Sequence, residues 1–147
     1  MVMKRTADAY WTGDTQNGQG TISTMSGAFK EQPYSFKTRF LSEDGKAGTN
    51  PEELIAAAHA ACFTMATSHI LNQAGFTADN LHTVAAVDIR PGADGFSIEG
   101  ITLQIQGKVP NLTAEQFQAY AETAKANCPV SKALAAVPIS LEVEFQS

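Results

Sequence analysis

The feature that most constrains this chain is a long segment, almost free of charge after its first turn, with a helix start signal at one end and a stop signal at the other. Asn50 is a favourable N-cap, Pro51 suits the first helical position, and Glu53 stands three residues after the cap. The apolar pattern continues to about Ala74 and is followed by Gly75, which favours a helix end. The sequence therefore predicts a helix over residues 51–74.

The first half of this predicted helix is apolar on nearly every side. Between Leu54 and Ala66 no face carries a run of polar residues, which predicts a helix buried all round. The most apolar stretch, residues 54–63, is only about ten residues long and contains His59, so it is expected to be too short to span a bilayer.

Strands are expected on both sides of this helix. Residues 6–12 and 21–26 flank a turn rich in Asn and Gly. Residues 34–40 alternate, which predicts a strand with Arg39 on the face opposite the aromatic side chains. After the helix, strands are expected at 82–90, 98–108 and 139–145, and helices at 113–127 and 129–136. Because strands come in runs, the order predicts an α+β fold with largely antiparallel sheets.

Length and composition exclude several classes of protein. The chain has 147 residues, 44% of them hydrophobic and 17% charged, which fits one globular domain over residues 1–147. The net charge of −5 makes nucleic acid or an anionic membrane an unexpected partner. Two cysteines are too few for a disulfide scaffold, and the first residues have no apolar signal core, so a cytoplasmic protein is expected.

The two cysteines differ in what their positions allow. Cys62 lies mid-helix, where a free thiol usually packs as a small hydrophobic group and would need a cation brought from elsewhere to become reactive. Cys128 precedes Pro129 at the expected N-cap of a short helix, where free N–H groups can stabilise a thiolate. On this reasoning Cys128 is either the better nucleophile or a poor substitute for a Ser or Asp cap.

Three other side chains could serve a reactive thiol, but each also has a simpler interpretation. Arg39 could be a solvated cation, and Glu52 suits a helix N-terminus without further function. His59 stands three residues before Cys62, where it could accept the thiol proton or pack in the core. No metal-ligand spacing, phosphate loop or nucleophile elbow accompanies these residues.

Three segments resemble the OsmC/Ohr family of hydroperoxide peroxidases. Residues 48–63 read GTNPEELIAAAHAACF and resemble the signature helix of that family, and residues 128–131, CPVS, resemble its second cysteine motif. Residues 32–40, QPYSFKTRF, are similar to the segment of the OsmC branch that carries an active-site arginine. The resemblance covers nearly the whole chain, from WTGD at residues 11–14 to the last strand.

The resemblance implies a role for each matched residue. Cys62 would be the peroxidatic cysteine, and Cys128 the resolving one. Arg39 would activate the thiolate, and Glu52 would orient Arg39 through an ion pair. His59 stands where other branches carry an aromatic residue, which argues against an essential base. No metal, haem, flavin or nicotinamide is implied, only an external dithiol or lipoyl-type reductant.

The resemblance also implies an OsmC-like fold in which two antiparallel-rich sheets wrap the long central helices of an intertwined homodimer, with active sites at the subunit interface. Glu52 and Cys62 are ten residues apart. On a straight helix this is about 15 Å along the axis and about 80° around it, so Glu52 can hardly serve Cys62 of its own helix. A two-fold axis near Ala57 would place Glu52 of one chain opposite Cys62 of the other.

The activity implied is reduction of organic hydroperoxides, and more weakly of hydrogen peroxide. The Cys62 thiolate would attack the peroxide and become a sulfenic acid, and Cys128 would then form an intrasubunit disulfide. Candidate walls of the substrate pocket are four apolar side chains: Phe36, Phe40, Phe63 and Met65. Two rivals stay open, namely a redox sensor that uses the same thiols once and a carrier of small apolar ligands with inert thiols.

Overall fold

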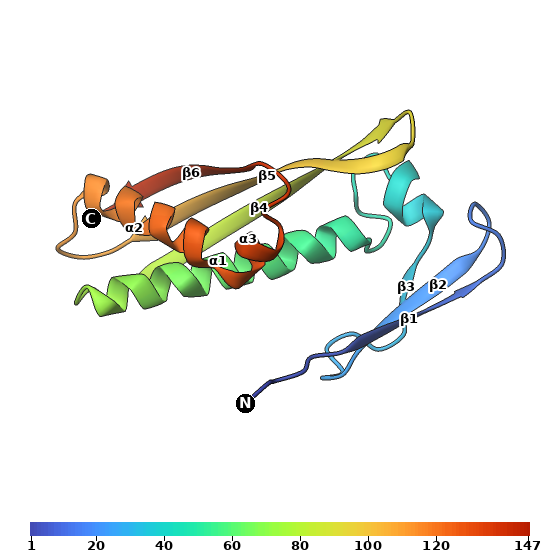
Figure 1. Ribbon diagram of the computed structural model, residues 1–147, viewed down its shortest axis with the longest axis horizontal. Helices are drawn as coiled ribbons and strands as arrows, with labels where there is room; N and C mark the ends of the chain where they lie inside the picture. Colours follow the sequence, from blue (N-terminus) through green and yellow to red (C-terminus); the bar gives the residue numbers. More distant parts are fainter. The chain divides into compact units, whose positions relative to one another are not determined.

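The computed structural model describes residues 1–147 and divides into two compact units, Met1–Leu54 and Ile55–Ser147, which are described separately. The long helix α1 (Pro51–Gln73) begins in the first unit and continues in the second (Figure 1). That the chain folds as a single domain stays a prediction.

The first unit is built on a three-stranded antiparallel sheet. Its strands are β1 (Ala7–Thr12), β2 (Gln19–Thr24) and β3 (Gln32–Tyr34), in the order β1-β2-β3 (Figure 1). In the turn after β1, Oδ1 of Asp14 accepts hydrogen bonds from the N–H groups of Gln16 and Asn17, at 3.0 and 2.9 Å. This turn confirms the predicted hairpin.

The strand expected over residues 34–40 is wrong beyond Tyr34, because the chain turns there into a single π-helical turn, η1 (Lys37–Leu41). The N–H of Thr38 donates to Oγ of Ser35 at 3.2 Å, and the N–H of Ser35 donates to Oγ1 of Thr38 at 2.9 Å. Such a reciprocal pair satisfies the free N–H groups at a helix start. This local capping outweighs the alternating pattern, so Arg39 lies on a helical turn.

Helix α1 begins and ends where the sequence predicts. The N–H of Glu53 donates to Oδ1 of the N-cap Asn50 at 2.8 Å. At the other end Gly75 has a φ of +88°, which a residue with a Cβ rarely adopts.

The expectation that α1 is buried all round is wrong for the single chain. In the second unit its fully buried residues, His59, Phe63, Thr67 and Leu71, are spaced four apart and form one stripe. Another face is exposed and apolar and comprises Ala57, Ala58, Ala61 and Met65. By length and composition alone α1 could cross a membrane, but the core helices of soluble proteins also meet this criterion. The expectation from residues 54–63 alone therefore understated its apolar length.

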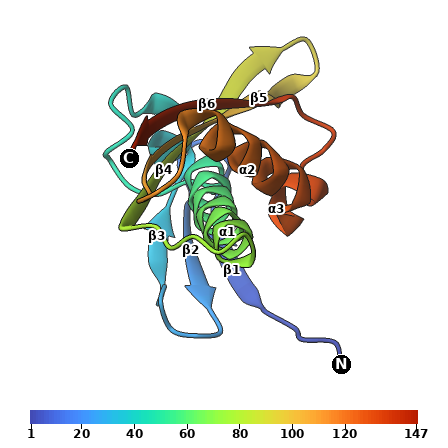
Figure 2. The ribbon, with the colours of Figure 1, turned by 90° about the vertical axis from the view of Figure 1, so that its left-hand side faces the viewer.

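The second unit holds a mixed three-stranded sheet, formed by β4 (Asn80–Gly92), β5 (Gly95–Lys108) and β6 (Ile139–Gln146). Strands β4 and β5 form an antiparallel hairpin, but β6 is parallel to β5. Strand pairing is therefore antiparallel in all but this pair, which confirms the predicted α+β fold with largely antiparallel sheets. Strands β5 and β6 are parallel because the chain crosses over through α2 (Ala114–Asn127) and α3 (Pro129–Ala133), and α3 ends before the expected residue 136. Helices α1 and α2 lie on the same face of this sheet (Figures 1 and 2).

The hydrophobic core lies between that face of the sheet and the helices. Ile101, Leu103 and Ile105 point inward from β5, as their alternation predicts. On α2, capped by Thr113 and Gln116, the buried residues are Phe117, Ala121 and Ala124. All of the fully buried hydrophobic side chains of the protein belong to residues 63–128.

Candidate active site

The two cysteines meet in the second unit. Cys62 lies on α1, and Cys128 lies at the junction of α2 and α3. The N–H of Cys128 closes α2 by donating to the carbonyl oxygen of Ala124 at 2.9 Å, and its own carbonyl oxygen accepts from the N–H of Lys132 at 3.1 Å. Although the cysteines are 66 residues apart, their Sγ atoms lie 2.8 Å apart within one hydrogen bond, and both thiols are free.

The two sulfurs differ in their access to solvent. Cys128 is 0% exposed and belongs to the hydrophobic core. Cys62 is only partly buried. A molecule arriving from solution therefore meets Cys62 first.

The surroundings act on the two thiols in opposite directions. Burial raises the pKa of Cys62, and its hydrogen bond with Cys128 adds to this, while the N–H of Val130 partly offsets it. Burial alone would also raise the pKa of Cys128, but hydrogen bonds with Cys62, Ser131 and the N–H of Val130 outweigh burial and lower it. No cationic side chain of residues 55–147 acts on Cys62, so this unit by itself favours a thiolate at Cys128.

His59 lies in the core and approaches the thiols through a serine. Nε2 of His59 lies 2.7 Å from Oγ of Ser131, whereas Nδ1 is buried without a hydrogen-bond partner. Burial lowers the pKa of His59, so its ring is neutral. Ser131 is the third residue of α3, which begins directly after Cys128, and it is one of the groups that lower the pKa of Cys128. Sequence reasoning missed Ser131, for which the only signal was its place in the CPVS motif.

Arg39 and Glu52 form an ion pair within the first unit. Nε of Arg39 lies 3.2 Å from both carboxylate oxygens of Glu52, and Nη2 lies 2.7 Å from Oε1. The Glu52 side chain is 9% exposed and that of Arg39 is 37% exposed. A two-point contact of this kind fixes the plane of the guanidinium as well as its position.

Local hydrogen bonds explain why Glu52 rather than its neighbour faces Arg39. The hydroxyl of Thr38 donates to the carbonyl oxygen of Thr49 at 3.0 Å, which ties η1 to the start of α1. The hydroxyl of Thr49 donates to the carboxylate of Glu53 at 2.8 Å and holds it at the exposed surface. Glu52, the residue before Glu53 in the first turn, is thereby left for Arg39.

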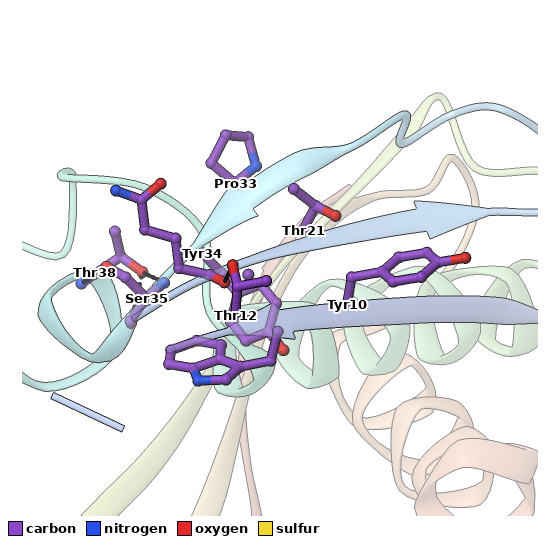
Figure 3. Close-up of a pocket in the computed structure, with 10 residues that line it drawn as sticks. Tyr10, Thr12, Thr21, Pro33, Tyr34, Ser35 and Thr38 are labelled. Atoms are coloured by element: carbon purple, nitrogen blue, oxygen red, sulfur yellow. Dashed lines mark hydrogen bonds between the residues drawn. The ribbon is translucent and has the colours of Figure 1, made fainter. Parts of the chain in front are cut away.

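Arg39 lines a hollow in the first unit. The hollow has a volume of about 230 Å³ and is lined by Trp11, Thr15, Tyr34, Ser35, Phe36, Arg39 and Phe40. The guanidinium lies 4.8 Å from the centre of the Phe40 ring, which favours the cation. A second hollow of about 460 Å³ lies beside it, with Tyr10, Tyr34, Ser35 and Thr38 among the residues around it (Figure 3).

Two of the four predicted pocket walls therefore belong to the hollow beside Arg39, namely Phe36 and Phe40. Phe63 does not qualify, because it is fully buried in the core of the second unit. Met65 is 73% exposed and lines a separate open groove along α1 and β4. The structure thus brings together the four predicted site residues as two pairs, one in each unit, and the catalytic role of each stays a prediction.

Comparison of the sequence with known proteins gives a consistent result. The profile of the family described as "OsmC-like protein" matches residues 43–144. The chain is 46% identical to Peroxiredoxin OsmC of Escherichia coli over 147 residues, which are 100% of both chains. It is 33% identical to the organic hydroperoxide resistance protein OhrB of Bacillus subtilis over 103 residues, which are 69% of this chain and 74% of OhrB.

Solved structures agree with these matches. The crystal structure of Bacillus subtilis OhrB superimposes with a TM-score of 0.70 at 26% identity and covers 96% of this chain and 98% of that one. An OsmC-like protein of Vibrio cholerae shares the fold with a TM-score of 0.76 at 15% identity, covering 97% of this chain and 99% of that one. On sequence and on fold, the chain belongs to the OsmC family.

Proposed function

We propose that this protein is a cysteine-based peroxidase that reduces organic hydroperoxides to alcohols. The observation that carries the proposal is the 2.8 Å approach of Cys62 and Cys128 across 66 residues of sequence. Two free thiols at this distance can pass between a dithiol and a disulfide with little movement. Relatives named Peroxiredoxin OsmC and organic hydroperoxide resistance protein support the same chemistry.

Cys62 is the sulfur that attacks the peroxide. Access supports this assignment, because Cys128 is 0% exposed and so is closed to a bulky hydroperoxide. The thiolate of Cys62 attacks the terminal peroxide oxygen, the O–O bond breaks, and the alkoxide takes up a proton and leaves as the alcohol. Cys62 is oxidised to a sulfenic acid as the peroxide is reduced.

The raised pKa of Cys62 means that this step needs a cation from outside residues 55–147. Arg39 supplies it: the guanidinium favours the thiolate and donates hydrogen bonds to the peroxide oxygens as charge develops on them. Glu52 keeps the guanidinium in a fixed plane through its two-point contact. The aromatic hollow beside Arg39 provides a surface for the organic part of the substrate and favours alkyl hydroperoxides over hydrogen peroxide.

The reaction takes place in a homodimer, with Arg39 and Glu52 of the partner subunit serving Cys62. The exposed apolar stripe on α1 (Ala57, Ala58, Ala61 and Met65) supports this arrangement, because small side chains let an antiparallel copy of the helix approach closely. Sedimentation of the wild type as a monomer at micromolar concentration would argue against it.

Cys128 completes the cycle. Its sulfur attacks the sulfenic sulfur of Cys62, the S–O bond breaks, and hydroxide takes up a proton and leaves as water. An external dithiol or lipoyl-type reductant then reduces the Cys62–Cys128 disulfide, and the protein needs no metal or organic cofactor. A reducing cytoplasm suits this cycle because the disulfide is there a transient state.

Steady-state turnover of an alkyl hydroperoxide with a dithiol tests the proposal, on the wild type and on both cysteine variants. Cys62→Ser is expected to lose peroxide reduction altogether. Cys128→Ser is expected to form a sulfenic acid that a sulfenate trap labels on Cys62, and to lose efficient turnover. Sulfenate found only on Cys128, in the Cys62→Ser variant, would reverse the assignment.

The same measurements separate the two rival functions. A redox sensor would consume one equivalent of peroxide and then stop, even with excess dithiol. A carrier of apolar ligands would show no peroxide reduction and would bind its ligand equally well in both cysteine variants.

A further inference from the structure

A second contact joins α1 to α3 beside the two sulfurs, and none of the steps above uses it. Nε2 of His59 lies 2.7 Å from Oγ of Ser131. His59 stands three residues before Cys62 on α1, so the two lie on neighbouring positions of one helix face. Ser131 stands three residues after Cys128, which is the N-cap of α3. The same two segments are therefore joined twice, once by this hydrogen bond and once by the 2.8 Å contact of the sulfurs.

Both partners in the contact are buried, since His59 is 0% exposed and Ser131 is 5% exposed. Nδ1 of His59 has no hydrogen-bond partner, so the bond to Ser131 is the one hydrogen bond that offsets the cost of burying the ring. A hydrogen bond is directional, whereas the apolar contacts of Val130 and Leu134 with the core are not. The polar contact therefore selects one position of α3 on α1.

Helix α3 passes this constraint to Cys128 through its backbone. The helix is only five residues long, too short to be stable through its own hydrogen bonds. Its first turn closes where the carbonyl oxygen of Cys128 accepts from the N–H of Lys132 at 3.1 Å. The side chain of Cys128 makes no capping hydrogen bond at this turn. Fixing Ser131 thus fixes the backbone of Cys128 one turn earlier, and the sulfur is left to meet that of Cys62.

We propose that the His59–Ser131 contact holds Cys128 in place for disulfide formation. Both partners in the contact are then positioning residues. The inference rests on the proposed function, because it concerns the step in which the thiolate of Cys128 attacks the Cys62 sulfenic acid. In that step the S–S bond forms, the S–O bond breaks, and hydroxide takes up a proton and leaves as water. Without the contact, α3 would sample several positions on α1, and the sulfurs would spend less time within reach of each other.

The disulfide equilibrium of the full chain tests the inference without any peroxide. The protein is equilibrated with mixtures of reduced and oxidised glutathione, and the fraction that holds the Cys62–Cys128 disulfide gives an equilibrium constant. Ser131→Ala and His59→Leu are each expected to lower this constant by about fivefold, which is the bias that one hydrogen bond gives to an equilibrium between two positions.

Three further variants show whether the contact itself is responsible. His59→Gln should keep the constant near that of the wild type, because the side-chain amide can still hydrogen-bond to Ser131. The double variant of His59→Leu with Ser131→Ala should lose no more than either single variant, since both substitutions remove the same contact. Thr67→Val is the matched control, because the buried hydroxyl of Thr67 bonds only within α1, to the carbonyl oxygen of Phe63 at 2.9 Å. It should leave the constant unchanged.

The lifetime of the Cys62 sulfenic acid gives a kinetic readout, after one equivalent of an alkyl hydroperoxide. A sulfenate trap added at successive times measures how fast the disulfide replaces the sulfenic acid. The lifetime is expected to lengthen about fivefold in Ser131→Ala and His59→Leu, because the sulfurs are within reach for a smaller fraction of the time. A wild-type lifetime in both variants would contradict the inference.

The glutathione equilibrium separates failure of this inference from failure of the proposed function. Unchanged constants in both Ser131→Ala and His59→Leu would overturn the inference. Losses that multiply in the double variant would also overturn it, since they would show two independent effects. Equal losses in His59→Leu and His59→Gln would do the same, because they would show that the ring only fills space. If the wild type reduced no peroxide, the proposed function would fail, while the equilibrium constants would still decide the inference.

Discussion

The two pairs of predicted site residues are assembled in different ways. Arg39 and Glu52 are 13 residues apart and meet through turn and capping contacts in a unit that contributes none of the fully buried hydrophobic side chains. Cys62 and Cys128 are 66 residues apart and meet only because α1, α2 and α3 share a core. The cationic pair is thus a local feature and the thiol pair a product of global packing. Substitutions at the first pair should therefore disturb fewer packing contacts than substitutions in the core around the second pair.

The largest expected effect is that of removing the cation. Arg39→Ala should raise the pKa of the Cys62 thiol and lower kcat/KM for an alkyl hydroperoxide by about 10² to 10³-fold, as loss of a group that stabilises developing charge usually does. Urea denaturation should also show a loss of stability, because the nearly buried carboxylate of Glu52 is left without its cation, but the transition should remain cooperative. Arg5→Ala is the matched control, since Arg5 is exposed and bonds only to its neighbours. Turnover near the wild-type rate in Arg39→Ala would remove Arg39 from the mechanism.

Overfilling the core of the second unit should act mainly on the stability of the fold. A Cβ on Gly107 would collide with the ring of Phe117, so Gly107→Ala is expected to lower the free energy of unfolding by about 1–3 kcal/mol. Gly100→Ala on the same strand is the control, because its Cβ would meet nothing nearer than 3.7 Å.

The same variant shows how far the two units depend on each other. Trp11, the single tryptophan, reports on the first unit by fluorescence, while far-UV circular dichroism reports on both. Since the first unit has no buried core of its own, both signals should shift together to lower urea. A Trp11 transition that stays in place would show that the units unfold independently.

Neutralising Glu52 should lower kcat/KM less than removing Arg39 does. Glu52→Gln keeps one acceptor for Arg39 but loses the charge-assisted two-point contact, so kcat/KM should fall by about tenfold while some activation of Cys62 remains. Glu53→Gln is the control, because Glu53 binds Thr49 at the surface. If kcat/KM fell equally in Glu52→Gln and Glu53→Gln, the effect would come from the lost negative charge at the helix start and not from the orientation of Arg39.

The smallest expected effect is a pH dependence of stability. Burial holds the pKa of folded His59 below its ordinary value of 6.5. Above pH 6.5 the ring is largely neutral in both the folded and the unfolded chain, so His59 does not lower the free energy of unfolding there. Below it the unfolded chain binds a proton that the folded chain does not, so stability falls by up to about 1.4 kcal/mol per pH unit. Urea curves at pH 7.5 and 5.5 should show a smaller loss for His59→Gln than for the wild type, whereas His69→Gln on the exposed side of α1 should behave like the wild type.

Much of the fold could be predicted because its start and stop signals are local. The Asn50 cap, the Thr113–Gln116 capping box and the alternation along β5 each determine an element from a few neighbouring residues. The segment after Tyr34 failed because two local signals compete there, and the Ser35–Thr38 exchange prevails over alternation. The exposed stripe on α1 could not be foreseen, since an all-apolar helix does not indicate which of its faces its own chain covers.

For the candidate site, too, local features could be predicted from the sequence, whereas contacts between distant segments could not. The motifs pointed to the residues of both pairs, and spacing placed Glu52 within the first turn of α1. The environment of the sulfurs could not be read from the sequence, because it depends on contacts between segments far apart in the chain. Ser131 illustrates this, since its partner His59 is 72 residues away.

The complete burial of Cys128 has a consequence for how a reductant would regenerate the thiols in the proposed cycle. In a Cys62–Cys128 disulfide, an incoming reductant can approach only the sulfur of Cys62, because Cys128 has no exposed surface. In the proposed cycle the mixed disulfide with the reductant therefore forms on Cys62 of α1, and the sulfur of Cys128 is the leaving group.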